Sequence, residues 1–350
     1  MGRPPGSLPT PPELVFSLQT LHDRARTLNK KIVLPEGEDP RTLRAAAWLV
    51  EQQLVRPVLL GRESTVRSVA ENAGVSLGPG LPVIDPQTSE KRQEYAQMLF
   101  NRRKHKGLTY EAARDSAGEV VPFGDLMVAS GEADGCVAGA CHPTPDIVRH
   151  AIQILGVAPT SAIVSSFFLM VLPDGRPLTY ADCGVNPTPD AEGLASIGLD
   201  AAANHRFLTG EEPRVAFLSF STKGSADHPA VDLVRDAVAR AQAQRPDMAI
   251  DGELQFDAAF DPGVGERKAP GSAVAGRANV FVFPTLDAGN IGYKITQRVG
   301  GAEAFGPILQ GLSKPANDLS RGSDWEDIAT VAIITALQAE VAASKPVIAK

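Results

Sequence analysis

The sequence predicts an α/β protein in which helices cover both faces of a mainly parallel β-sheet. Strand-like and helix-like segments alternate along the chain, and the strand-like runs are continuously apolar. Strands that are buried on both faces of a parallel sheet have this pattern, whereas half-exposed strands alternate apolar and polar residues. The length of 350 residues allows either two domains or one large domain.

The first half of the chain shows this alternation in short steps. Asp39 is suited to cap a helix, because Pro40 follows at the first helical position. Gly74 is a typical helix stop. The expected helices are 13–30, 39–54, 63–74 and 144–156, and the expected strands are 31–35, 56–61, 133–140 and 161–172.

The second half continues in the same way. Strands are expected at 214–220 and 279–284, and helices at 229–244 and within 287–300. No repeat and no low-complexity linker separates two halves, so these patterns do not define a domain boundary. Residues 1–12 are rich in Pro and Gly, which predicts a mobile arm.

Composition excludes several functional classes. The net charge of −7 argues against a general nucleic-acid or anionic-membrane binder, and no apolar run is long enough to span a bilayer. The three cysteines, Cys136, Cys141 and Cys183, fit a reducing compartment and thus a cytoplasmic protein. His142 next to Cys141 does not make a zinc site, because no second ligand pair follows. We therefore expect buried thiols and no metal.

A hydroxyl, a cation and carboxylates gather just before the last apolar helix. Ser323 and Glu326 match a capping box, which leaves Ser320 and Arg321 in the loop before the helix and Asp327 in its first turn. A helix N-terminus beside an Arg suits phosphate or carboxylate. The alternative is simple helix capping with a solvated Arg.

Three other polar segments each allow two interpretations. Residues 219–229, with Lys223 and Gly224, form either a second anion cradle or an ordinary strand-to-helix turn. The acids of 250–262 lie in a loop-like region, where a structural charge network is favoured over a metal site. The cationic run at 101–109 is either a solvated helix face or a contact for a polyphosphate ligand.

Motifs of several common enzyme classes are missing. The sequence has no G-x-S-x-G, no H-E-x-x-H and no clean G-x-G-x-x-G after a strand. These absences argue against an α/β-hydrolase, a zincin and an ordinary Rossmann dehydrogenase.

Many separate motifs together resemble the phosphate acetyltransferases, a family that also includes phosphate butyryltransferases. The resemblance covers roughly residues 15–340, and the C-terminal domain of some malic enzymes shares the fold. The motifs are LPEGEDPRTLRAA, RKHKGLT, DIVRHAIQILG, STKGSA, DGELQFDAA, ANVFVFPTLDAGNIGYKITQR, GPILQGLSKPANDLSRG and WEDI.

The resemblance implies an α/β fold of two α/β/α domains with mainly parallel sheets and an active-site cleft between them. It implies a discontinuous first domain, 13–149 with 311–350, and a second domain, 150–310. The implied enzyme moves an acetyl group reversibly between CoA and inorganic phosphate. It implies a homodimer without a tightly bound cofactor, with CoA or acetyl-CoA, acetyl phosphate and phosphate as small-molecule substrates.

Residue roles carry over position by position. The family's catalytic Ser-Arg pair falls on Ser320 and Arg321, and its catalytic Asp on Asp327. The family's CoA-associated arginine falls on Arg103, and another active-site arginine falls on Arg149. The remaining expected substrate-binding residues, which line the cleft, are Asn290, Tyr293 and Lys294.

The chain departs from the family pattern at two points. Many members have Cys where this chain has Ser323, which argues against a covalent acetyl-cysteine here. The Pro-rich run 142–146 leaves the path of its loop open.

The implied chemistry gives Asp327 a demanding role. A thiolate is the nucleophile, so the CoA thiol, with a pKa of about 8.5, must lose its proton. An ordinary Asp, with a pKa of about 3.9, is a weak base for that task unless its site is partly dry. We hypothesise that Asp327 is the general base and that Arg321 holds the phosphate.

Two other functions stay open at the sequence level. A phosphate butyryltransferase would differ only in its acyl pocket, which the sequence does not define. A non-catalytic acetyl-CoA sensor is disfavoured because Ser320, Arg321 and Asp327 are all present. A metal-dependent decarboxylase of similar architecture would need a nucleotide site that the sequence lacks.

Overall fold

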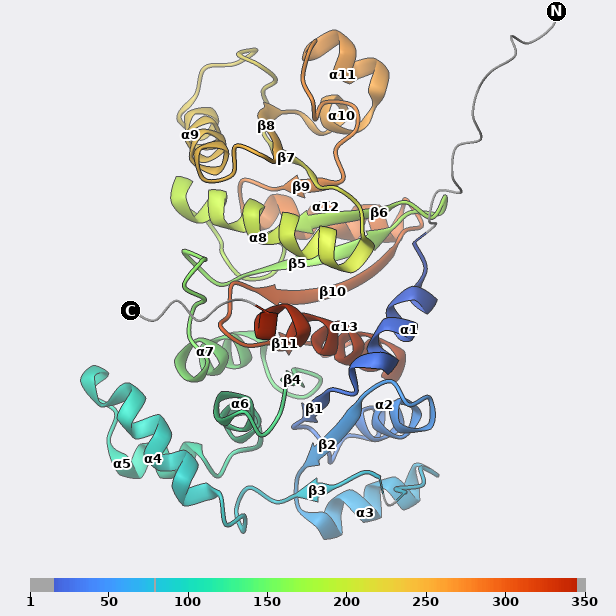
Figure 1. Cartoon of the computed structure of the whole chain (residues 1–350), viewed down its shortest axis with the longest axis vertical. Helices are drawn as coiled ribbons and strands as arrows, with labels where there is room; N and C mark the ends of the chain where they lie inside the picture. Colours follow the sequence, from blue (N-terminus) through green and yellow to red (C-terminus); the bar gives the residue numbers. More distant parts are fainter. Residues whose placement is uncertain (1–15, 79, 345–350) are drawn as a thin grey trace, which may run out of the picture.

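The chain forms two β-sheets, one above the other in Figure 1, with helices packed around both. The structure is a computed structural model that describes residues 16–78 and 80–344. The predicted mobile arm, residues 1–12, lies outside the described residues.

The first sheet has five strands in the order β11-β4-β1-β2-β3, and every neighbouring pair is parallel. Its last strand comes from far along the chain, which places Ala316–Asp318 beside Gly135–Ala138. The strands are β1 (Lys31–Leu34), β2 (Arg56–Leu60), β3 (Val83–Ile84), β4 (Gly135–Ala138) and β11 (Ala316–Asp318).

Local signals position the helices around this sheet. The Asp39 carboxylate accepts the backbone N–H of Arg41 and caps α2, with Pro40 at its first position, as predicted. Pro143 precedes Thr144, so the Pro-rich run 142–146 leads directly into α7. The helices are α1 (Leu18–Leu28), α2 (Pro40–Glu51), α3 (Glu63–Asn72), α4 (Arg92–Arg103), the short 3₁₀ turn η1 (Lys104–Lys106), α5 (Tyr110–Ser116), α6 (Val120–Ser130) and α7 (Thr144–Ile154).

The second sheet has six strands in the order β10-β5-β6-β9-β7-β8. Helix α8 packs on β6 and β9, and α9 packs on β8. The strands are β5 (Ser165–Val171), β6 (Pro177–Ala181), β7 (Arg214–Leu218), β8 (Ala249–Leu254), β9 (Val280–Val282) and β10 (Glu303–Gln310); the helices are α8 (Ala191–Thr209), α9 (Pro229–Gln244), α10 (Phe256–Phe260), α11 (Pro262–Lys268) and α12 (Leu286–Arg298).

One strand differs from the parallel pattern. Strand β5 runs antiparallel to both neighbours, β6 and β10. The turn at Pro173–Gly175 closes a hairpin, in which Leu172 N–H donates to the Arg176 carbonyl at 3.0 Å. Because β5 is buried on both faces, it has the same apolar run as a parallel strand. Several other elements were not predicted from the sequence, among them β6, β10 and α8.

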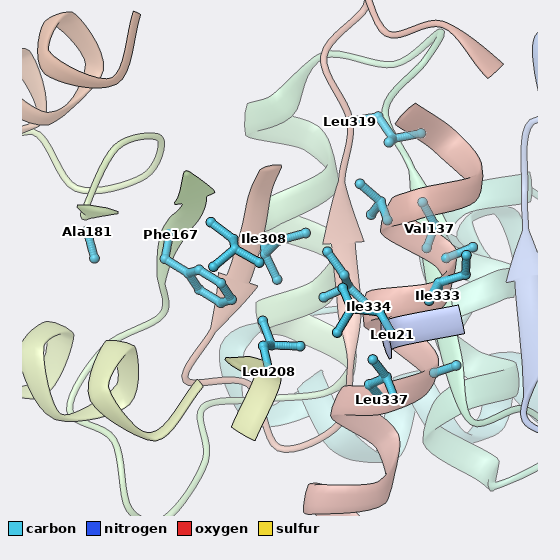
Figure 2. Packing of buried hydrophobic residues seen from close by; sticks show 14 of the residues in the cluster. Leu21, Val137, Phe167, Ala181, Leu208, Ile308, Leu319, Ile333, Ile334 and Leu337 are labelled. Atoms are coloured by element: carbon cyan, nitrogen blue, oxygen red, sulfur yellow. The ribbon is translucent and has the colours of Figure 1, made fainter. Parts of the chain in front are cut away.

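Helix α13 (Trp325–Ser344) joins the two sheets through one shared core. Its Ile328, Ile333, Ile334 and Leu337 are each at most 1% exposed. Figure 2 shows Ile333, Ile334 and Leu337 packed near Leu21 of α1 and Ile308 of β10. A helix that is apolar all round is buried, so α13 fixes the loop that leads into it.

The first sheet takes its strands from residues 31–138 and 316–318, and the second from 165–310. The α/β class with mainly parallel sheets is therefore confirmed. The predicted domain limits themselves stay a prediction.

Candidate active site

The candidate site lies at the carboxyl edge of the first sheet, where three neighbouring strands end. Strands β11, β4 and β1 are parallel neighbours, so the residues that follow them meet. The chain continues from β1 to β2 on one side and places β4 on the other. Ligands of open α/β sheets bind at such a switch point.

The loop after β11 is closed by its own polar groups. Gly322 N–H donates to the Ser320 hydroxyl oxygen at 3.2 Å, and Ser323 N–H donates to the Ser320 carbonyl at 2.9 Å. Leu319 is buried, whereas Ser320 and Arg321 are exposed. The Ser320 hydroxyl proton makes no hydrogen bond to a described residue, so this hydroxyl can donate to a ligand.

The predicted capping box was wrong by one residue. Helix α13 begins at Trp325, and the reciprocal bonds join Asp324 and Asp327 instead of Ser323 and Glu326. Asp327 N–H donates to Asp324 Oδ1 at 2.8 Å, and Asp324 N–H donates to Asp327 Oδ2 at 3.1 Å. Two acidic side chains cap the helix because a carboxylate at either position accepts an N–H at the positive helix end.

The helix cap uses only one carboxylate oxygen of Asp327 and leaves the other able to accept a proton. Its Oδ1 makes no hydrogen bond to a residue within 16–78 and 80–344. Partial burial raises the pKa of Asp327, the backbone N–H of Asp324 lowers it, and the charges of Asp324 and Glu326 raise it further. The net direction is upward, which makes the carboxylate a better base.

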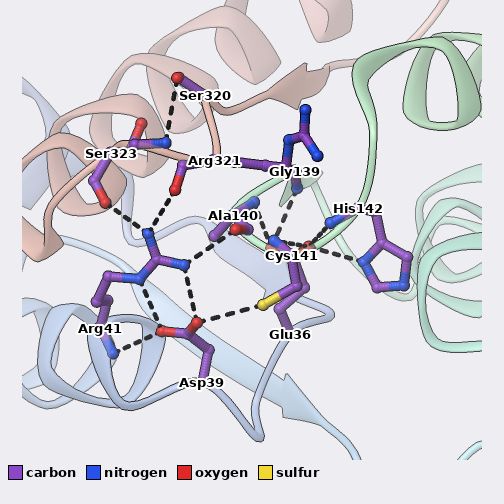
Figure 3. Close-up of polar contacts among 11 residues, drawn as sticks. Glu36, Asp39, Arg41, Gly139, Ala140, Cys141, His142, Ser320, Arg321 and Ser323 are labelled. Atoms are coloured by element: carbon purple, nitrogen blue, oxygen red, sulfur yellow. Dashed lines mark hydrogen bonds and ion pairs between the residues drawn. The ribbon is translucent and has the colours of Figure 1, made fainter.

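Arg41 of α2 holds the loop, a role that was not predicted from the sequence. Its Nη1 donates to the Arg321 carbonyl at 2.9 Å and to the Ser323 carbonyl at 2.8 Å. Its Nη2 donates to Asp39 Oδ2 and to the Ala140 carbonyl, both at 2.9 Å (Figure 3). The only sequence signal was an Arg directly after a capped helix start.

The Arg321 guanidinium itself makes no hydrogen bond or ion pair with a described residue. Figure 3 shows its side chain extended toward the loop that begins at Gly139. Arg41 thus fixes the backbone of this loop and leaves the Arg321 cation available. A guanidinium of this kind binds phosphate or carboxylate with two donors.

Glu36 fills a nest of backbone donors after β4. Its carboxylate accepts the N–H groups of Gly139, Ala140, Cys141 and His142 at 2.7–3.1 Å. His142 Nδ1 lies 2.7 Å from Glu36 Oε1. Burial would raise the pKa of Glu36, but the hydrogen bonds from His142 and the backbone outweigh it and lower the pKa. Such a nest binds anions, and here its anion belongs to the chain.

Arg103 and Arg149 come together in one pocket. They line a pocket of about 480 Å³ with Thr144, Gly184 and Val185, so its walls come from both sheet regions. Arg149 Nη2 lies 2.8 Å from Asp146, and Arg103 makes no side-chain hydrogen bond or ion pair within the described ranges. The two positive charges suit an anionic ligand.

Asn290 supports a wall of this pocket. Its Nδ2 donates to the Cys183 carbonyl at 3.1 Å, next to Gly184, and its Oδ1 accepts from Lys294 Nζ at 2.8 Å. Tyr293 stacks on Phe168 with 3.9 Å between ring centroids. All three predicted residues of α12 therefore contact protein groups. None of the three appears among the residues that line the pocket.

The polar loop after β7 is saturated by acids of β8. Lys223 pairs with Asp251, and the buried Glu253 accepts from Ser221 Oγ, Arg235 Nε and Gly224 N–H. The interpretation of residues 219–229 as an ordinary strand-to-helix turn is favoured, because the hydrogen-bond donors of this segment are paired within the protein.

The acids of 250–262 form a charge network, as predicted, but the region is not loop-like. It contains β8 and α10. Lys268, one of the cations just downstream, pairs with Asp257 at 2.8 Å. Within 16–78 and 80–344, no group of three or more His, Cys, Asp or Glu side chains is arranged to hold a metal ion.

The cysteines are not all buried. Cys136 and Cys183 are buried and their thiol pKa values are raised, first of all by burial. Cys141 is exposed and donates to Asp39 at 3.2 Å; partial burial of its thiol and the bond to Asp39 raise its pKa to about 12. The expectation of buried thiols was wrong for Cys141.

Among the described helices, none is both long and apolar enough to cross a bilayer.

These observations define the class of protein before any comparison. The chain is an α/β protein whose sheet edge carries a free guanidinium on a braced loop, near a pocket with two further arginines. That arrangement suits a transferase or binding protein for anionic substrates.

Comparison with known proteins agrees with this class. The profile of the family described as "Phosphate acetyl/butaryl transferase" matches residues 16–336. The chain belongs to this family and is a transferase. It is 50% identical to a phosphate acetyltransferase of Thermoanaerobacterium thermosaccharolyticum, over 92% of this chain and 99% of the relative.

Solved structures give the same result. A phosphotransacetylase of Staphylococcus aureus, EutD, is 47% identical and superposes with a TM-score of 0.85 over 92% of this chain and 98% of that chain. A phosphotransacetylase of Streptococcus pyogenes is 44% identical, with a TM-score of 0.87 over 93% and 100%. The two-sheet fold is therefore that of solved phosphotransacetylases.

Proposed function

We propose that this protein transfers an acetyl group reversibly between CoA and inorganic phosphate. The observation that carries the proposal is the free Arg321 guanidinium on a loop whose carbonyls are held by Arg41. The sequence identity with phosphate acetyltransferases supports the acetyl group as the one transferred.

In the direction of acetyl-CoA formation, the CoA thiolate attacks the acetyl carbon of acetyl phosphate. Asp327 accepts the thiol proton, which its raised pKa supports. Arg321 holds the phosphoryl group and stabilises the negative charge that grows on the carbonyl and phosphate oxygens. Ser320 donates its free hydroxyl proton to the same region.

Arg103 and Arg149 bind the phosphates of CoA or the reacting phosphoryl group. Both line the pocket that opens between the two sheet regions. Asn290 supports the neighbouring wall by donating to the carbonyl before Gly184. Lys294 holds the Asn290 amide oxygen, and Tyr293 stacks on Phe168. Placing both substrates side by side supplies much of the rate. No metal and no tightly bound cofactor is needed, because arginines and backbone N–H groups neutralise the phosphate.

We also propose that the enzyme is a cytoplasmic homodimer. An apolar stripe along α12 and its C-cap supports self-association: Ile291, Ile295 and the C-cap residue Val299 follow at every fourth residue and are 58%, 55% and 82% exposed. Three large apolar side chains on one helix face lose water contact when a second copy covers them. Light scattering of the purified protein tests this state, and a monomer at all concentrations would contradict it.

The function is tested by mixing purified protein with CoA and acetyl phosphate and following thioester absorbance. Rapid acetyl-CoA formation is the expected result. Some turnover with butyryl phosphate is expected, because an acyl pocket discriminates by only about 1–3 kcal/mol per methylene. Faster turnover with butyryl phosphate than with acetyl phosphate would favour a phosphate butyryltransferase instead. Saturable acetyl-CoA binding without turnover would favour a sensor.

A further inference from the structure

Asp318 is a buried acid that the proposed reaction does not yet use. It ends β11, two residues before Ser320, and is 1% exposed. Its Oδ2 lies 2.6 Å from Thr144 Oγ1, and its Oδ1 has no hydrogen-bond partner among the described residues. A buried carboxylate that lacks a partner for one oxygen is costly, so its retention needs an explanation.

The fold keeps room for this orphaned oxygen. Gly139 has a φ of +116°, and a Cβ added there would stand 2.5 Å from Asp318 Oδ1. The backbone beside Asp318 is held separately, because Leu319 N–H donates to the Ala138 carbonyl at 2.8 Å. The side chain is therefore not required to fix the strand end.

Thr144 connects Asp318 to the pocket. It is the first residue of α7, is partly exposed, and lines the pocket that carries Arg103 and Arg149. A Thr hydroxyl has one proton and two acceptor lone pairs. When Asp318 is ionised, Thr144 donates that proton to it and offers the pocket only lone pairs. When Asp318 is protonated, Asp318 donates to Thr144, and the Thr144 proton can point into the pocket.

The surroundings of Asp318 favour its protonated form more than water does. Burial is the main cause that raises the pKa of Asp318 to about 7; the charge of Glu36 adds to the rise, while the hydrogen bond from Thr144 and the N–H of Leu319 oppose it. Glu36 faces Asp318 from the end of β1, and its own partner is His142 of the loop after β4. Asp318 therefore exchanges a proton near neutral pH, as a general acid must.

The departing phosphate needs a proton. Expulsion of the phosphate from the attacked acetyl phosphate would otherwise produce the highly basic trianion. The Arg103 and Arg149 pocket is where a phosphate oxygen and Thr144 can meet.

We propose that Asp318 is a positioning residue that protonates the departing phosphate through the Thr144 hydroxyl. The inference rests on the proposed acetyl transfer. The Thr144 O–H bond breaks as its proton moves to a phosphate oxygen, and the proton of Asp318 moves to Thr144 Oγ1. Hydrogen phosphate leaves and Asp318 is ionised. Asp327 then releases the thiol proton to solvent, and Asp318 takes up a proton from solvent. In the reverse direction every transfer runs backward.

The test compares pH profiles of kcat/KM in both directions for the full chain. In the direction of acetyl-CoA formation, wild-type activity should fall as pH rises through the pKa of Asp318, because its acid form is required. In the phosphate-consuming direction, activity should rise through the same pKa. Asp318→Asn should abolish that step in both profiles and lower kcat by a factor on the order of 10² to 10³, with little change in the KM for CoA.

Thr144 variants keep the test decisive if Asp318→Asn folds poorly. Thr144→Val should reproduce the loss, and Thr144→Ser should restore both rate and profile. Asp125→Asn is the matched control, since Asp125 is also a buried acid with one orphaned oxygen. It should leave the profiles unchanged.

Three results would overturn the inference. One is a folded Asp318→Asn variant with the wild-type rate and pH profile. Another is an Asp318→Asn variant with a lower rate but an unchanged pH profile, which would indicate that Asp318 has a structural role only. The third is full activity in Thr144→Val. A wild type without transfer activity would instead refute the proposed function, and the inference with it.

Discussion

Two polar loops of similar composition differ in whether their cation is paired within the protein. Residues 319–324 follow β11 and residues 219–227 follow β7, and each combines hydroxyls, one cation and a Gly. In the second loop, Lys223 is paired with Asp251, and the Ser221 hydroxyl and the Gly224 N–H donate to Glu253. In the first loop, Arg41 occupies two carbonyls and leaves Arg321 unpaired. The neighbouring strand decides the outcome: β8 supplies acids to one loop, and no acid pairs with the Arg321 cation of the other.

The largest difference between the loops should appear when each cation is removed. Arg321→Ala should lower kcat/KM by a factor on the order of 10² to 10³, because preorganised donors stabilise transition-state charge. Lys223→Ala should leave kcat/KM within about twofold, since surface ion pairs contribute little. Steady-state assays with CoA and acetyl phosphate measure both. Equal losses in the two variants would mean that the second loop also binds substrate.

The helix cap behind the first loop allows a finer separation of charge from structure. Asp327→Asn keeps an acceptor for the Asp324 N–H but removes the proposed base, so kcat should fall by a factor on the order of 10². Asp324→Asn removes the neighbouring charge and keeps an acceptor for the Asp327 N–H, so it serves as the control. Similar kcat values in both variants would remove the base role and leave Asp327 as a cap.

The sequence predicted local structure better than contacts between distant segments. Continuous apolar runs located β1, β2, β4, β5, β7 and β9, and Asp39 with Pro40 located the start of α2 correctly. The same apolar run did not reveal that β5 is antiparallel, because burial on both faces hides strand direction. Helix α8 was missed, since its small residues, such as Gly198 against Phe217, pack closely and blur the helical period.

The candidate site shows the same limit. The motif placed Ser320, Arg321 and Asp327 on one loop and helix start, which depends on local sequence. The clamp by Arg41 and the bond between Asp318 and Thr144 join residues 280 and 174 positions apart. Long-range contacts of that kind have no local pattern, so only the fold reveals them.

The clamp itself can be removed to test whether the first loop must be held. Arg41→Gln leaves the carbonyls of Arg321 and Ser323 without their charged donor, so kcat/KM should fall about 10- to 100-fold. The free energy of unfolding should fall by about 2–3 kcal/mol, as expected for hydrogen bonds to a charged group. Arg44→Gln is the matched control on α2, because Arg44 is exposed and makes no hydrogen bond or ion pair with a described residue. Full activity in Arg41→Gln would show that the loop holds its shape alone.

The smallest effect on activity should come from the acid that saturates the second loop. Burial raises the pKa of Glu253, but Ser221, Arg235 and Gly224 N–H outweigh it and lower the pKa. A depressed folded-state pKa stabilises the protein above the unfolded pKa of about 4.3, and this contribution is lost as pH falls through the folded value. Glu253→Gln should therefore reduce the free energy of unfolding at neutral pH by about 1–3 kcal/mol and flatten its fall in acid, with kcat/KM unchanged.

Urea unfolding at neutral and acidic pH measures this effect, with Asp236→Asn as the control for an exposed ion pair with Arg240. The control should change the free energy of unfolding by no more than about 0.5 kcal/mol. A loss of kcat/KM in Glu253→Gln at full folding would contradict the comparison. It would mean that the conformation of the second loop affects catalysis, even though this loop does not contact the substrate.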